Sequence, residues 1–146
     1  MNNDEVTAIH EAAHAVVALR LDLVFDEVSV IPDEDLETDG ALHWIDLHGT
    51  GELEIDAESV AVVLIAGPCA EARFRKLRVD RVFMGEAALN DRMSIAELGL
   101  SEDEFVAATR EAIEHVEADW STIQRVGAVL VERGRLTFDE VAALVD

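Results

Sequence analysis

The clearest chemical motif in the chain is the segment His10-Glu11-Ala12-Ala13-His14, an H-E-x-x-H motif. On a helix, positions i and i+4 lie on the same face, so both imidazoles can point at one metal ion. Glu11, one residue along, can reach a water on that ion and act as general base. Imidazole ligands with an oxygen ligand and an open position are typical of catalytic zinc. The motif therefore predicts a zinc-dependent peptidase site with Zn²⁺ as cofactor.

The competing interpretation is a helix face whose two histidines bind nothing. The flanking sequence, TAIHEAAHAVVAL, is apolar on both sides of the motif. A glutamate buried in such a helix is costly without a partner or a metal. The flanks therefore favour the metal site.

Two histidines do not complete a catalytic zinc site, so a third protein ligand is needed. The remaining histidines are candidates: His43, His48 and His115. Many carboxylates are candidates too, among them Glu71 in the segment AGPCAEARF. The extended motif HExxHxxGxxH does not supply the ligand, because its last two positions are Val17 and Arg20 here. Spacing alone leaves the third ligand open.

The elements that must position these residues follow from hydrophobic periodicity and turn residues. Helices are predicted over residues 4–21, 57–76, 87–98, 101–119, 121–133 and 138–145. Strands are predicted over 27–31 and 41–47, with an acidic loop at 33–40 between them. Gly67-Pro68 predicts a kink or break in the second helix, and Thr137 with Glu140 has capping-box spacing. We expect one domain, 1–146, that is mostly α with a small β-sheet (α+β).

Composition limits the partners and the compartment. The formal charge is -21, from 32 acidic against 11 basic residues, which disfavours nucleic acid and anionic membranes as partners. The longest apolar run, residues 60–66, is too short for a bilayer. The N-terminus has no signal-peptide pattern, so we expect a cytoplasmic protein. Cys69 is the single cysteine, so no intramolecular disulfide forms, and we expect it to be buried.

Five segments form an ordered set along the chain: AIHEAAHAVVAL, VSVIP, ALHWIDL, AGPCAEARF and AALNDRMSIAEL. In this order they resemble segments of the peptidase domain of the FtsH-type membrane-anchored ATP-dependent zinc metalloproteases. The family's counterparts are its HEAGHAVV helix, proline-ended strand, ALGY strand, AGRAAEELVFG helix and GA-x-ND segment. The end of the chain is similar to that domain's terminal helices. The resemblance implies an FtsH-like zinc peptidase fold with an HExxH helix and a C-terminal helical bundle.

The resemblance also implies a role for each matching residue. It makes His10 and His14 zinc ligands and Glu11 the catalytic base. It makes Asp91, in ALNDRM, the third ligand. A carboxylate at a helix start is pre-positioned by backbone N–H groups, and its charge helps to neutralise Zn²⁺. Glu71 then supports a ligand from behind or packs beside it, and is not itself a ligand.

The ALHWIDL strand is the implied substrate-binding edge, with Ala41, Leu42, His43 and Trp44 contacting an extended peptide through main-chain hydrogen bonds. These 146 residues contain no Walker motif, so we expect a stand-alone zinc metallopeptidase that hydrolyses peptide bonds in unstructured polypeptides. The resemblance also suggests a homo-oligomer, or a separate ATPase or adaptor partner on which the cleavage of folded substrates would depend. Two alternatives are a catalytically silent metal-bound domain that binds a partner, and a regulatory peptidase that cleaves a repressor.

Overall fold

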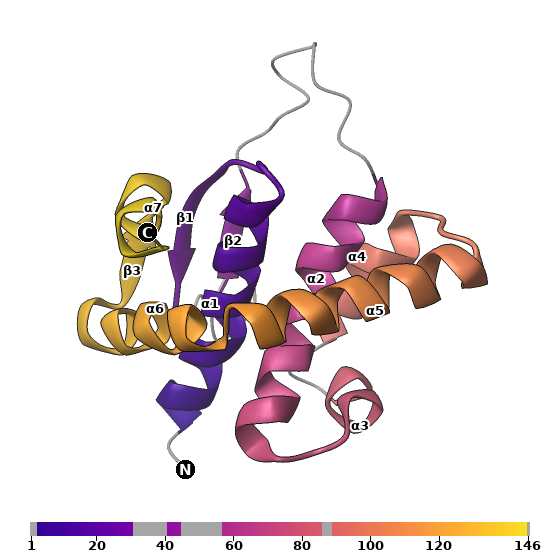
Figure 1. Ribbon diagram of the computed structural model, residues 1–146, viewed down its shortest axis with the longest axis horizontal. Coiled ribbons are helices and arrows are strands. Elements are labelled where there is room, and N and C mark those ends of the chain that lie inside the picture. Colours follow the sequence, from indigo (N-terminus) through magenta and orange to yellow (C-terminus); the bar gives the residue numbers. More distant parts are fainter. Residues whose placement is uncertain (1–2, 31–40, 45–56, 86–88, 146) are drawn as a thin grey trace.

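The computed structural model describes residues 3–30, 41–44, 57–85 and 89–145 (Figure 1). These residues are mostly α-helical with a small β-sheet, which confirms the predicted fold class. The elements are α1 (Asn3–Arg20), β1 (Phe25–Ser29), β2 (Ala41–Trp44), α2 (Ala57–Arg75), α3 (Val79–Phe83), α4 (Leu89–Glu97), α5 (Glu102–Ala118), α6 (Trp120–Arg133), β3 (Arg135–Thr137) and α7 (Phe138–Val145). The acidic loop predicted over 33–40 and residues 45–47 of the predicted second strand lie outside the described residues.

Helix α1 is the centre of the hydrophobic core. Every residue from Ala8 to Ala18 is buried, so the helix is covered on all sides. Such burial is typical of a helix inside a core rather than one at a surface. α2 and α6 pack against α1, and α5 packs against α2. Figure 1 shows α6 and α5 running end to end across this pair of helices.

Helix α2 is continuous through Gly67 and Pro68, so of the predicted kink or break the break is wrong. Proline has no N–H to donate to the carbonyl of Leu64, and in an exposed helix this would favour a break. Here the residues from Ala61 to Ala72 are buried, and packing against α1 and α5 holds the helix together. Tertiary contacts therefore outweigh the local preference of proline.

The sheet has the strand order β2-β1-β3, with both pairs antiparallel. Strand β1 begins at Phe25, two residues before the predicted start. Phe25 and Val28 are both fully buried although they are three residues apart. A shift of register between Phe25 and Glu27 allows both side chains to face the core. Alternation along the sequence missed this bulge, and it missed the short elements β3 and α3.

Two of the later helices, α5 and α7, begin at capping boxes. Ser101 and Glu104 form a capping box at the start of α5. At the start of α7, the backbone N–H of Thr137 donates to Glu140 Oε1 at 3.0 Å, and the backbone N–H of Glu140 donates to Thr137 Oγ1 at 3.2 Å. The predicted capping box at Thr137 is therefore confirmed. Within the described ranges, no helix combines the length and the apolar character needed to cross a bilayer.

Candidate metal centre

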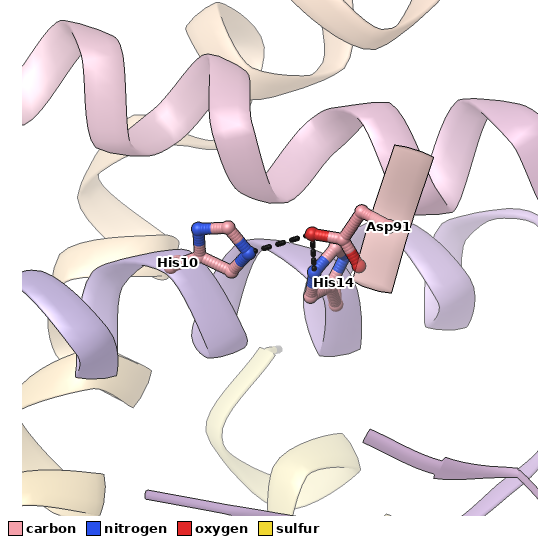
Figure 2. A group of neighbouring side chains, drawn as sticks. All are labelled: His10, His14 and Asp91. Atoms are coloured by element: carbon pink, nitrogen blue, oxygen red, sulfur yellow. Dashed lines mark hydrogen bonds and ion pairs between the residues drawn. The ribbon is translucent and has the colours of Figure 1, made fainter. Parts of the chain in front are cut away.

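Three side chains from two helices, two of them buried and one partly buried, meet at one point (Figure 2). His10 and His14 lie one turn apart on α1, and Asp91 lies in the first turn of α4. Asp91 Oδ2 is 2.9 Å from His10 Nε2 and 3.4 Å from His14 Nε2. One candidate ligand atom from each residue lies within 4.8 Å of the others. His10, His14 and Asp91 thus form a group that could hold a metal ion.

The orientation of His14 is set by a backbone carbonyl. Its Nδ1 lies 2.7 Å from the carbonyl oxygen of Val63 on α2. A carbonyl oxygen can only accept, so Nδ1 carries the proton. A neutral His14 then presents the lone pair of Nε2 toward Asp91 Oδ2. Two acceptors that face each other require a cation between them, either a proton or a metal, and the donor set therefore fits a metal ion.

The orientation of His10 is set in the same way by a carboxylate. His10 Nδ1 donates to Glu71 Oε1 at 3.0 Å, and Arg75 Nη1 donates to Glu71 Oε2 at 2.8 Å. Burial alone would raise the pKa of Glu71, but the hydrogen bonds and charges of His10 and Arg75 lower it. Glu71 is therefore an ionised acceptor, and Nε2 of His10 is left to face Asp91. A carboxylate behind a histidine is the usual way to orient a metal-binding imidazole.

The electrostatics of the site favour a cation at this point. Burial opposes charge on His10 and His14, but the charge and hydrogen bonds of Asp91 outweigh it and raise both histidine pKa values. Burial likewise opposes charge on Asp91, but the histidines hold the pKa of that carboxyl far below its usual range. The interior therefore stabilises positive charge where the nitrogens and the carboxylate meet.

Glu11 lies in the buried stretch of α1 beside the two histidines, with 7% of its surface exposed. Its negative charge contributes to the raised pKa of both His10 and His14. The predicted general base is therefore close enough to influence both candidate ligands.

The histidine rings lie against bare backbone of α2. A Cβ built on Gly67 would be 2.4 Å from both Cε1 and Nε2 of His14, and 2.8 Å from Cδ2 of His10. No side chain other than that of glycine fits this position without movement. The sequence marked Gly67 as a helix breaker and as part of the segment AGPCAEARF, and neither observation predicted this contact.

Helix α4, which carries Asp91, is fixed at its start by Arg92. The Nη1 of Arg92 donates to the carbonyl oxygens of Phe83 at 2.6 Å and Gly85 at 2.7 Å. These carbonyls lie at the C-terminal end of α3, where helix carbonyls have no partner within the helix. Sequence reasoning missed Arg92 because it did not predict α3. Arg75 was not predicted as a site residue, although it lies four residues after Glu71 on the same helix.

Residues 41–44 form β2, which in the described part of the chain pairs only with β1 and is an edge strand. Their side chains lie outside what the structure describes, as does His48. His115 lies on α5 and does not belong to the group formed by His10, His14 and Asp91.

No known family model matches this chain, and no curated protein sequence matches it significantly.

Proposed function

We propose that the protein is a zinc metallopeptidase with an FtsH-like peptidase fold, acting on unstructured polypeptides. The observation that carries the proposal is the convergence of His10 Nε2, His14 Nε2 and Asp91 Oδ2. Two imidazole nitrogens and one carboxylate are a set that zinc prefers, and three protein ligands leave the open position of a catalytic site. In this proposal His10, His14 and Asp91 are the zinc ligands.

In this proposal, different residues of the chain have different roles in hydrolysis. The ion, when bound, supplies Lewis acidity. The carboxylate of Glu11 accepts a proton from the attacking water and then donates it to the leaving amine. Glu71 and the carbonyl of Val63 hold the two imidazoles in the tautomer that presents Nε2. Glu11 is buried and Asp91 is partly buried, so their charges are screened less than at the surface, which strengthens their action.

The substrate class follows from the edge strand. Among the described residues β2 pairs with β1 alone, and we propose that its other side accepts an extended peptide through main-chain hydrogen bonds. Only a segment without structure of its own has its backbone groups free for this pairing. We therefore propose unfolded polypeptides as substrates, with delivery by a separate ATPase or adaptor where the substrate is folded.

Metal analysis and casein cleavage by wild type and Glu11→Gln test the proposal together. We expect about one zinc per chain in both proteins, because Glu11 is not a ligand, and cleavage by wild type alone. Casein is used because it is unfolded, so no ATPase is needed to unfold it. Zinc-loaded wild type that leaves casein intact would contradict the peptidase proposal and favour the catalytically silent metal-bound domain.

A further inference from the structure

The hydrogen bond between His14 and Val63 forces the imidazole against one residue of α2. In an α-helix the carbonyl of residue i points toward residue i+4, so the carbonyl of Val63 points toward Gly67. The Nδ1 of His14 is 2.7 Å from that oxygen. The ring must therefore pass over the Cα of Gly67, where a Cβ would stand 2.4 Å from Cε1 and Nε2. Real Cβ atoms essentially never show contacts below 3.0 Å.

Neither the backbone of α2 at Gly67 nor the ring of His14 can move to make room for a Cβ. The backbone of α2 is held on both sides, because Ala61 to Ala72 are buried and α2 packs against α1 and α5. His14 is 3% exposed, and moving its ring away would break the bond to Val63. His10 closes the same space, because its Cδ2 would be 2.8 Å from the added Cβ.

We propose that Gly67 is a positioning residue of the metal centre. Because Gly67 has no Cβ, the His14 ring can reach the carbonyl of Val63. The hydrogen bond to that carbonyl fixes the proton on Nδ1. Nε2 is then free to face Asp91 and the ion. This rests on the proposed function for the metal itself, while the contact between Gly67 and the rings does not. A side chain at position 67 displaces the metal-binding nitrogen without removing any ligand.

Zinc affinity of Gly67→Ala, measured by competition with a chromophoric chelator, is the first test. We expect a loss of about tenfold to hundredfold, as for other residues that orient a ligating histidine. Gly127→Ala is the matched control. Gly127 also lies in a helix packed on α1, but its added Cβ would be 3.3 Å from the end of the flexible Ile9 side chain. We expect it to keep wild-type affinity. Wild-type affinity in Gly67→Ala would overturn the proposal.

The histidine tautomer gives a readout that general packing would not move. In ¹⁵N-labelled, zinc-loaded protein, long-range ¹H–¹⁵N spectra report which nitrogen of His14 is protonated. We expect a protonated Nδ1 in wild type and Gly127→Ala, and loss of that state in Gly67→Ala. A Gly67→Ala protein whose His14 keeps a protonated Nδ1 and a coordinating Nε2 would overturn the proposal.

Urea unfolding of metal-free protein covers the case in which Gly67→Ala does not fold. The substitution is made in wild type and in a His10→Ala/His14→Ala background. Without the rings, alanine should be tolerated or stabilising, because it is the better helix former; with the rings it should be destabilising. Equal destabilisation in both backgrounds would overturn the inference. A wild type that takes up no zinc would count against the proposed function, while this comparison, which needs no metal, still decides the role of Gly67.

Discussion

At the scale of single residues, the candidate metal centre depends on the group that hydrogen-bonds to Nδ1 of each histidine. His10 is backed by Glu71, which is itself bonded to Arg75, and His14 is backed by the carbonyl of Val63. Both arrangements place the proton on Nδ1 and leave Nε2 for a cation. The ligands and their supports therefore act as one unit.

Replacement of Glu71 by glutamine tests this support. The amide keeps the shape of the side chain but loses the charge that holds His10 and Arg75. We expect zinc affinity to fall by about tenfold to hundredfold with the ligands unchanged. Glu117→Gln is a control, because Glu117 meets Arg73 at 3.5 Å on the surface. Equal zinc affinity in the two variants would contradict a supporting role for Glu71.

Much of the site at this scale could be predicted from the sequence, and the rest could not. His10 and His14 follow from helical spacing alone, and the apolar flanks explain their burial. Asp91 lies 81 residues from His10, so only the resemblance singled it out. Gly67 and the carbonyl of Val63 act through the packing of α2 on α1, which no local pattern encodes.

At the scale of elements, the site depends on how α4 is held against α1. Asp91 is carried by α4, and Arg92 fixes the start of that helix to carbonyls at the end of α3. We expect Arg92→Gln to loosen α4 and lower zinc affinity while all three ligands remain. Hydrogen exchange should then be faster over residues 89–97. Arg78→Gln, which removes an exposed pair with Asp80, should change neither; identical exchange and affinity in the two variants would refute the role of Arg92.

The capping box of α7 predicts a pH dependence of stability. Hydrogen bonds from Thr137 lower the pKa of Glu140 from its ordinary value of 4.5. A lowered folded-state pKa contributes stability that is present above the ordinary value and is lost as pH falls through the lowered one. Glu140→Ala should therefore be destabilising at neutral pH, and the difference from wild type should shrink in acid.

Urea unfolding at neutral pH and below pH 4 measures this difference. Glu132→Ala, at an exposed position on α6, serves as a control for removing a negative charge. A cost for Glu140→Ala that is the same at both pH values would show that the carboxylate does not carry the cap.

The helices were predictable at this scale from hydrophobic periodicity, and at α5 and α7 the caps agree with it. Ser101 and Thr137 mark real helix starts. Pro68 suggested a break because the loss of its backbone hydrogen bond is a local effect. The burial that offsets this loss comes from packing against α1 and α5. The start of β1 was missed because a bulge breaks the alternation between Phe25 and Val28.

At the scale of the whole molecule, a bound metal would tie together segments that are distant in sequence. The ligands come from α1 and α4, and their supports come from α2. An ion that binds only the folded state stabilises it by about 2.7 kcal/mol when its free concentration is a hundred times Kd. Zinc should therefore raise the thermal midpoint of wild type, measured by circular dichroism, and leave that of His14→Ala unchanged. A similar rise in both proteins would mean that zinc binds elsewhere.

We have proposed that His10, His14 and Asp91 together hold one zinc ion. A crystal structure of the zinc-loaded protein, with diffraction data recorded on both sides of the zinc absorption edge, tests it most directly. We predict one strong anomalous peak at about 2.0–2.2 Å from His10 Nε2, His14 Nε2 and an Asp91 oxygen. A zinc-loaded crystal with no peak at this point, or with Asp91 turned away from both histidines, would rule out this zinc site.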